Sequence, residues 1–343
     1  MFKTYQQLLV LLICILISPA GWSASFECNS KSLTEIDHFI CRNTNISALD
    51  ERMAKVYAEN YKKLSPYNRV SYLNSQRDWL KYWPQACLKR KDDKINSEQF
   101  LECAEMMYDK RLDILAISQT KNRWPVFNIA KYSVVKADKS QVPDWVKMVD
   151  HSLIYPQIET AELQTSDAVI ANKINIWIVS NSKKLGLKNR ISLNENFMDS
   201  FLDMALEEVS PDILRLRTLY YFDRFGAHGN SVTSHEHFIL SQSRDLREGD
   251  LLKGVWQNMV AEDVYQKILI QEPGMVLVDS PKQVLESVSR IQTWDISKEG
   301  FGFQFSPYEL TAYAAGSPQV IIEWEKLQPY LTDYAKSQLP MMY

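Results

Sequence analysis

Hydrophobic residues recur every three or four positions through most of the segment from Thr34 to Ser118, which is the periodicity of amphipathic helices. Asn45 or Ser47 is placed to cap the first long helix, and Ser65-Pro66 is placed to end it. The pattern predicts three helices after a short leading one, in a small bundle. The residues at helical spacing are Leu49, Met53, Val56, Tyr57, Tyr61 and Leu64, then Leu73, Leu80 and Trp83, then Phe100, Ala104, Met107, Tyr108, Leu112 and Leu115.

After Thr120 the pattern changes to short alternating segments mixed with helical ones. Ile174, Ile176 and Ile178, for example, alternate along one predicted strand. We therefore expect an α+β fold in which helices pack on an antiparallel sheet. The predicted strands cover residues 173–179, 214–225, 232–240, 301–305 and 319–324, and the predicted helices cover residues 196–209 and 250–270.

The first 24 residues have the features of a secretory signal peptide. Lys3 is their one charged residue, an apolar run extends from Leu8 to Ile17, and small residues lead to Ala24, where we expect cleavage. An uncleaved anchor is the alternative, but about ten apolar residues are too few to cross about 30 Å of hydrocarbon as a helix. We expect a periplasmic or secreted protein, soluble and without a membrane span in its mature form.

The change of pattern places a domain boundary between Ser118 and Arg123. This gives a helical domain over residues 25–118 and an α+β domain over residues 124–343. Without the leader the chain is about twice the common size of one domain, which agrees with two folding units.

Composition and charge exclude several classes of protein. The chain is 45% hydrophobic and 24% charged, which are globular proportions and exclude a disordered or low-complexity chain. With 39 basic and 42 acidic residues, it lacks the strongly basic face of a nucleic-acid binder. After residue 117 there are 28 acidic and 23 basic residues, so the second domain carries the negative charge.

Without the leader's Cys14, four cysteines remain: Cys28, Cys41, Cys87 and Cys103. An even number in an exported segment indicates two disulfides, and the spacings are too wide for the close pairs of a zinc site. Four cysteines allow three pairings. We expect the local one, Cys28–Cys41 with Cys87–Cys103, in which each bond closes a loop of about 15 residues and stabilises by about 3 kcal/mol.

A set of residues in the helical domain resembles the N-terminal domain of the LprI-type lysozyme inhibitors. Trp83-Pro84 before Cys87 and Ala104 after Cys103 depart from the pattern of that family. The resemblance implies a cysteine-stapled helical domain associated with lysozyme. It rests on Phe26-x-Cys28, Asp37-x-x-Ile40-Cys41, Leu49-Asp50, Tyr57, Gln76-Arg77-x-Trp79-Leu80, Cys87, Cys103, Tyr108, Arg111 and Leu115.

The second domain contains several short motifs: Gly226-Ala227-His228-Gly229-Asn230, Phe303-x-Phe305-x-Pro307-Tyr308-Glu309, Tyr313-Ala314-Ala315-Gly316, Val320-x-Ile322 and Leu327-x-x-Tyr330-Leu331. These motifs resemble the RsiV-like domain. This domain is named after an extracytoplasmic anti-sigma factor that senses lysozyme by binding it, and similar domains accompany cell-wall polysaccharide deacetylases. Glu323 stands where proline is common, and the chain has no sigma-binding segment, so signalling is not implied.

Three histidines, His228, His235 and His237, lie within ten residues around one predicted hairpin. His235 and His237 share a face of the strand, so a three-histidine metal site of the hydrolytic type is geometrically feasible. The alternative is that they are surface or turn histidines, and it is favoured because the adjacent acid, Glu236, points to the opposite face. We therefore expect no metal ion and no cofactor.

The sequence shows no other motif that is typical of a catalytic site. It has no G-x-S-x-G elbow, no P-loop and no G-x-G-x-x-G, and pairing the four cysteines leaves no free thiol. We therefore expect that the protein is not an enzyme.

Aromatic side chains on one helix, Tyr72, Trp79, Tyr82 and Trp83, are spaced mostly for a core. Trp83, at the helix end beside Pro84, is the best candidate for an exposed anchor, because Trp and Tyr dominate binding hot spots. The run Lys89-Arg90-Lys91 is more typical of a solvated loop than of a partner site. The turn from Ser306 to Gly316 fits either buried structure or a binding rim, and we favour buried structure.

These observations predict an exported bacterial envelope protein that binds or inhibits a lysozyme. Lysozymes are cationic glycosidases, so an inhibitor needs a loop for the cleft and complementary charge at its rim. The candidate loops are Gly226 to Asn230, with His228 and Asn230, and Pro84 to Asn96, beside Trp83. One alternative is a module that binds peptidoglycan or another envelope protein, and a second is a metal-dependent envelope hydrolase that uses His228, His235 and His237.

Overall fold

The computed structural model describes residues 24–120, 124–188, 195–297 and 299–339. All but the last residue of the predicted signal peptide, residues 1–24, lies outside this described part. Within it, no helix combines the length and the apolar character needed to cross a membrane.

The N-terminal region is helical, as predicted. A short helix, α2 (Glu35–Arg42), precedes three long ones: α3 (Thr44–Lys63), α4 (Pro66–Ala86) and α5 (Glu98–Leu115). Disulfides join Cys28 to Cys41 and Cys87 to Cys103, which is the local pairing.

The predicted cap of α3 is wrong. The helix begins earlier, with Asn43 at its N-cap, and Asn45 and Ser47 lie inside the first turn. Ser47 is buried, and its amide donates to the carbonyl oxygen of Asn43 at 2.9 Å. Ser65-Pro66 does mark the end of α3, since Ser65 caps α4 through a hydrogen bond from the amide of Asn68.

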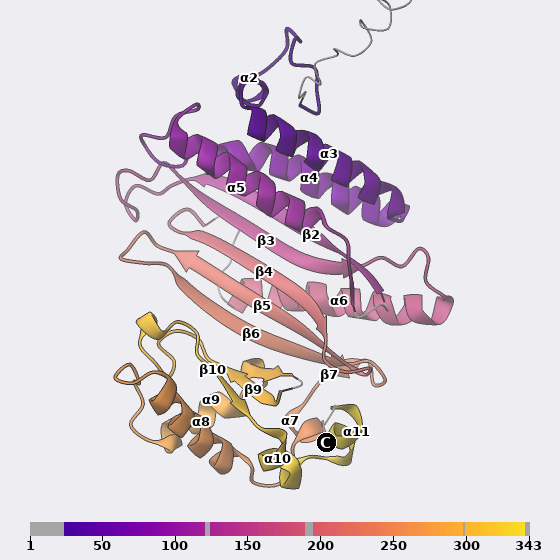
Figure 1. The fold of residues 1–343 in the computed structure, drawn as a ribbon, viewed down its shortest axis with the longest axis vertical. Coiled ribbons are helices and arrows are strands. Elements are labelled where there is room, and N and C mark those ends of the chain that lie inside the picture. Colours follow the sequence, from indigo (N-terminus) through magenta and orange to yellow (C-terminus); the bar gives the residue numbers. More distant parts are fainter. Residues whose placement is uncertain (1–23, 121–123, 189–194, 298, 340–343) are drawn as a thin grey trace, which may run out of the picture.

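Seven strands form one sheet in sequence order (Figure 1). Every neighbouring pair is antiparallel except β3 and β4, which run parallel because the long helix α6 (Thr165–Lys188) connects them across the sheet. The fold is α+β, as expected, although the parallel pair was not foreseen. The strands are β1 (Ser118–Thr120), β2 (Trp124–Lys136), β3 (Met148–Ile158), β4 (Asp199–Glu208), β5 (Ile213–Asp223), β6 (Asn230–Ile239) and β7 (Arg244–Asp245).

Two predicted elements have the wrong type of secondary structure, one a helix instead of a strand and the other a strand instead of a helix. The expected strand at 173–179 is part of α6, where Ile174 and Ile178 are buried on one face and Ile176 is 71% exposed. The expected helix at 196–209 contains β4, in which Leu202 and Met204 are buried at strand spacing. In both segments the apolar residues fit either period, and packing on the sheet decided between them.

The other predictions for this region agree with the structure in outline. Residues 214–225 and 232–240 form the hairpin β5–β6, and 301–305 and 319–324 contain short strands, although Trp324 already begins a helix. The predicted helix at 250–270 is split into two helices. The C-terminal elements are α7 (Glu248–Leu251), α8 (Gln257–Gln271), α9 (Pro281–Ser289), β8 (Trp294–Ile296), β9 (Phe301–Gln304), β10 (Gln319–Ile322), α10 (Trp324–Leu327) and α11 (Asp333–Gln338).

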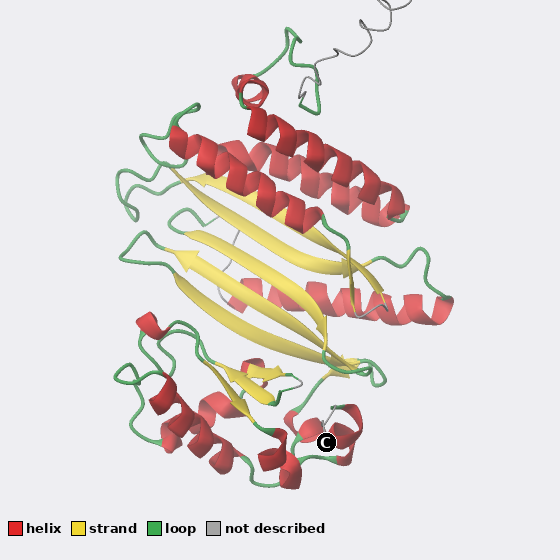
Figure 2. Ribbon diagram, viewed as in Figure 1, coloured by secondary structure: helices red, strands yellow, loops and turns green. Residues whose placement is uncertain are grey.

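The elements form layers around the large sheet (Figure 2). The helices α4 and α5 lie on β2 and β3, where Phe127 and Ile129 join the helical core, and α3 packs on these two helices. The helix α6 covers another face, where Ile174 and Ile178 pack with residues of β4 and β5. The C-terminal elements build a third core around Trp256, beside β6.

Candidate functional site

Three connections meet at one end of the large sheet. They are the α4–α5 loop (residues 87–97), the β2–β3 loop (residues 137–147) and the β5–β6 turn (residues 224–229), all at the left of Figure 1. Arg90 of the first loop lies over the ring of Trp145 in the second, and Trp145 meets Phe225 in the third edge to face. We call this part of the molecule the loop end. Both loops proposed from the sequence lie here.

A cleft of about 340 Å³ opens at the loop end, between the helices and the sheet. Its floor is an ionic cluster, in which the ammonium of Lys89 lies 2.6 Å from a carboxylate oxygen of Asp150 and 2.6 Å from one of Asp199. The hydroxyl of Tyr82 donates to the second oxygen of Asp150 at 2.5 Å. The backbone amide of Asp150 donates to the second oxygen of Asp199 at 3.0 Å.

The two carboxyl groups of the floor have opposite pKa shifts. Burial and the charge of Asp150 raise the pKa of Asp199 to about 7. Burial also disfavours the charge on Asp150, but Lys89 and Tyr82 outweigh it and hold the pKa of Asp150 below its usual value. Near neutral pH the floor therefore holds a lysinium, a carboxylate and a second carboxyl group that gains or loses its proton there.

Aromatic rings form two walls of the cleft. Phe201 of β4 and Tyr221 of β5 are register partners, and their rings stack with centroids 4.9 Å apart. Tyr82 of α4 stacks on Tyr132 of β2 at 4.6 Å. The walls thus come from four elements distant in sequence, with the polar floor between them.

An exposed aromatic cluster lies beside the cleft, at the tip of the β5–β6 hairpin. The ring of His228 stacks on that of Tyr313, with centroids 3.6 Å apart, and Tyr308 packs against both. The hydroxyl of Tyr313 donates to the carbonyl oxygen of Gly229 at 2.7 Å. We call His228, Gly229, Tyr308 and Tyr313 the aromatic tip.

Backbone constraints shape the aromatic tip. A Cβ atom on Gly229 would lie 2.1 Å from the hydroxyl of Tyr221, so only glycine fits between the tip and the cleft wall. Tyr308 has φ of 67°, a conformation that side chains other than glycine rarely adopt, and its side chain is 54% exposed. Strained backbone of this kind gathers at binding sites. The turn from Ser306 to Gly316 is therefore partly exposed, whereas the sequence favoured a buried one.

The structure corrects the predicted anchor Trp83. Its side chain is 1% exposed and packs among Trp79, Phe100 and Tyr108, because Pro84 does not end the helix and α4 continues to Ala86. Among the other candidates, His228 is exposed at the aromatic tip, and Asn230 is the half-buried first residue of β6.

The loop that contains Lys89-Arg90-Lys91 is only in part solvated. Arg90 is exposed, but Lys89 points into the cleft and pairs with two aspartates. Sequence reasoning missed these aspartates because isolated acids in strands carry no motif. The available signal was weak, since Asp150 and Ser152 are two polar positions on a face of β3 that also carries Met148, Ile154 and Ile158.

The three histidines that we considered as metal ligands do not meet. His228 lies at the tip, whereas His235 is five residues into β6, roughly 17 Å from the start of that strand. In the described part of the chain, no group of three or more histidine, cysteine, aspartate or glutamate residues could hold a metal ion. His235 and His237 are buried rather than at the surface, and burial lowers the pKa of His235 to about 4.

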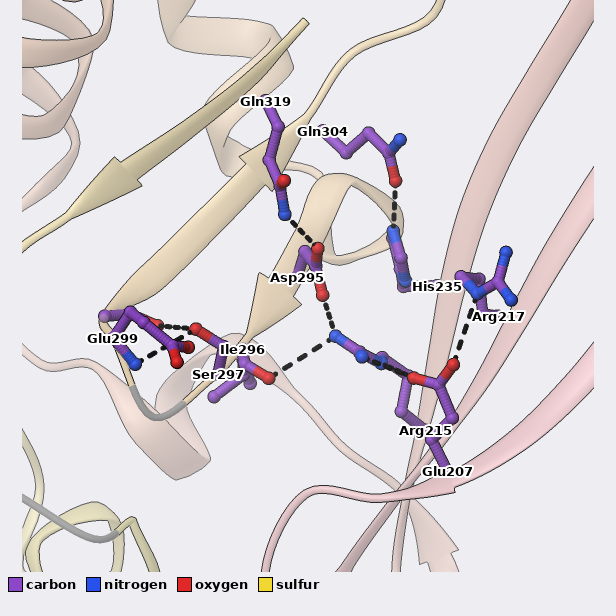
Figure 3. Close-up of polar contacts among 11 residues, drawn as sticks. Glu207, Arg215, Arg217, His235, Asp295, Ile296, Ser297, Glu299, Gln304 and Gln319 are labelled. Carbon is purple, nitrogen blue, oxygen red and sulfur yellow. Dashed lines mark hydrogen bonds and ion pairs between the residues drawn. The ribbon is translucent and has the colours of Figure 1, made fainter. Parts of the chain in front are cut away.

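His235 instead belongs to a polar junction between the two sheets (Figure 3). Its Nε2 lies 3.1 Å from the amide oxygen of Gln304 on β9. Arg215 of β5 pairs with Glu207 of β4 and with Asp295 of β8, so one guanidinium joins the two sheets. This junction fixes the C-terminal elements, and with them Tyr308 and Tyr313, relative to the hairpin.

Comparison with known proteins identifies one segment. Residues 256–325 match a family described as "Protein of unknown function (DUF3298)", so the chain carries a C-terminal DUF3298 domain. This segment includes Tyr308 and Tyr313 of the aromatic tip. No curated protein matches the chain. The resemblance of the N-terminal region to LprI-type inhibitors stays a prediction, with which the two disulfides are consistent.

Two similar solved structures are both of DUF3298 family proteins. One, from Bacteroides fragilis NCTC 9343, is 12% identical, covers 63% of this chain and 96% of its own, and gives a TM-score of 0.41. The other, from Pseudomonas aeruginosa PAO1, is 12% identical, covers 62% of this chain and 97% of its own, and gives a TM-score of 0.42.

Proposed function

We propose that this protein is an exported, non-catalytic binding protein of the bacterial envelope, and that its partner is a lysozyme. The observation that carries the proposal is the aromatic tip. Residues from three motifs of the RsiV-like resemblance that are separate in sequence meet there: His228 and Gly229, then Tyr308, then Tyr313. The named member of that family senses lysozyme by binding it.

The chemistry of the tip suits a protein partner. Its rings are held by stacking and by the bond from Tyr313 to Gly229, so little conformational entropy is lost on binding. Exposed tyrosines combine a large apolar face with a polar end, which is why they dominate binding hot spots. The acidic excess after residue 117 favours a cationic partner such as a lysozyme.

Two further observations agree with export. Both disulfides are compatible with an oxidising space such as the periplasm or the exterior of the cell. The leader predicted over residues 1–24 would deliver the chain there. Neither observation identifies the partner, which depends on the tip and on the resemblance.

Titration into lysozymes of several types tests the proposal. Mature protein is added to each lysozyme, and binding is measured by calorimetry and muramidase activity by turbidity. We expect saturable binding to at least one lysozyme, weakened at least roughly tenfold by Tyr308→Ala, as for a hot-spot residue. Tyr67→Ala is the matched control, because Tyr67 is 78% exposed on α4, outside the tip. Absence of binding to all lysozymes contradicts the proposed partner. Equal losses of affinity in both variants contradict the aromatic tip as the binding surface.

A further inference from the structure

The floor of the cleft beside the aromatic tip has hydrogen-bonding groups that remain available to a ligand. The side chains of Asp150 and Asp199 are each 15% exposed and that of Lys89 is 30% exposed, so all three face the open space. Besides the bond between the side chains of Asp150 and Asp199 themselves, each of their oxygens takes part in one hydrogen bond within the floor and has a further lone pair. Lys89 uses two of its three N–H donors. The floor therefore offers several acceptors and one donor to a ligand rich in hydroxyl or amide groups.

The walls are aromatic, although Lys110 lies over the ring of Phe201 and Arg111 over the ring of Tyr132. The stacked pairs Phe201–Tyr221 and Tyr82–Tyr132 line the cleft, beside the floor. A sugar ring has a face of C–H bonds that packs on an aromatic ring, while its hydroxyl groups point to the side. A saccharide unit thus matches walls and floor together, which neither a purely apolar nor a fully charged ligand does.

The mouth of the cleft carries two cations. Arg90 lies over the ring of Trp145, and Lys110 lies over the ring of Phe201 with its ammonium 4.9 Å from the centroid. Among the described residues neither side chain forms an ion pair, although Lys110 lies near enough to Asp203 for its charge to oppose the rise in the pKa of that carboxyl group. Asp223 also lines the cleft, and its carboxylate accepts a bond from the amide of Phe225. Both cations are therefore available to an anionic ligand group.

We propose that this cleft binds an acidic sugar, meaning a saccharide unit that carries a carboxylate. The ring packs between the aromatic walls, its hydroxyl or amide groups bond to the Lys89–Asp150–Asp199 floor, and its carboxylate pairs with Lys110 or Arg90 at the mouth. The volume of about 340 Å³ suits a small ligand, near the lower limit of such sites. The proposal goes beyond lysozyme binding and does not depend on it.

Two sugars that differ by one carboxylate test the proposal. N-acetylmuramic acid is N-acetylglucosamine with an added lactyl ether, so the pair isolates the role of the charge. Each is titrated into the mature protein at low salt, and binding is followed by ligand-observed NMR and calorimetry. We expect saturable binding of both, with N-acetylmuramic acid preferred roughly tenfold, as one charge-assisted hydrogen bond provides.

Two variants locate the site. Lys110 is exposed, so Lys110→Gln is expected to keep the fold and to lose most of the preference for N-acetylmuramic acid. Lys55→Gln, at an exposed lysine of α3, is the matched control and should behave as the wild type. Phe201→Ala should weaken both sugars, with folding checked by near-UV circular dichroism.

The outcomes separate this proposal from the lysozyme proposal. Absence of saturable binding of N-acetylmuramic acid to folded wild type overturns it, whatever the lysozyme titration gives. Equal affinity for the two sugars overturns the acidic class of ligand. A preference that survives Lys110→Gln and Arg90→Gln together places the carboxylate elsewhere and overturns the cleft as its site.

Discussion

The ring of His228 lies on the ring of Tyr313, with centroids 3.6 Å apart. The hydroxyl of Tyr313 also bonds to Gly229, which lies 84 residues earlier in the chain. These contacts join a hairpin of the large sheet to the DUF3298 segment, residues 256–325. Because Tyr308 packs on the same pair, a change in the hairpin turn is expected to displace the exposed ring of Tyr308 as well.

Gly229→Ala should disrupt this arrangement. The added methyl group would lie 2.1 Å from the hydroxyl of Tyr221, so either the turn or the tyrosine must move. We expect a loss of about 2 kcal/mol in the free energy of unfolding, as for an overpacked core, measured by urea denaturation. Gly226→Ala is the control in the same turn, because a Cβ atom on Gly226 would meet nothing within 4 Å. Equal stability of the two variants would show that the turn adapts freely.

Asp199→Asn should change how stability depends on pH. The pKa of about 7 for Asp199 lies above the value of about 3.9 for an unfolded aspartate. Between these values the folded state binds more protons, so this group makes the free energy of unfolding fall as pH rises from about 4 to about 7. Between pH 5 and pH 8 the free energy of unfolding of the variant should therefore rise relative to that of the wild type, by on the order of 1–2 kcal/mol.

Asp150→Asn is the informative comparison for that experiment. The pKa of Asp150 is lowered, so its charged form stabilises the folded state at pH values above the unfolded pKa. This variant should lose stability at neutral pH, opposite in sign to Asp199→Asn. Parallel behaviour of the two variants in urea denaturation would contradict the division of charge between them.

His235 should make the protein sensitive to mild acid. Its pKa of about 4 is below the unfolded value of about 6.5, so the unfolded state binds more protons between these values. The free energy of unfolding should fall as pH drops from 6.5 to 4, by about 3 kcal/mol from this group. His235→Gln should flatten the curve of stability against pH, and His38→Gln, at an exposed position, should not. An unchanged slope in His235→Gln would count against this origin.

Arg215→Met should weaken the junction between the sheets. The substitution leaves Glu207 and Asp295 without their shared guanidinium, and a partly buried charge that loses its partner costs about 3 kcal/mol. Arg217→Met is the control, because Arg217 is 45% exposed and pairs with Glu207 alone. Thermal unfolding of both variants checks the prediction, and a smaller loss for Arg215→Met would show that apolar contacts alone hold the junction.

The sequence alone determined the features that depend on neighbours along the chain. The helical region and the hairpin of residues 214–240 follow from periodicity, and the even number of cysteines indicated two disulfides, whose pairing as Cys28–Cys41 and Cys87–Cys103 only the structure decided among three possibilities. The exposure of His228 also follows from a glycine-rich turn between two strands.

Only the tertiary structure decided the rest. Whether Ile174 and Ile178 belong to a helix or a strand, and whether Trp83 is an anchor or core, depended on which surface lay opposite them. In the floor of the cleft, Lys89 contacts Asp199, which lies 110 residues later in the chain. No pattern of neighbouring residues predicts this contact. Local propensity acts over a few residues, whereas burial, ion pairing and pKa shifts arise from groups that approach only when the layers pack.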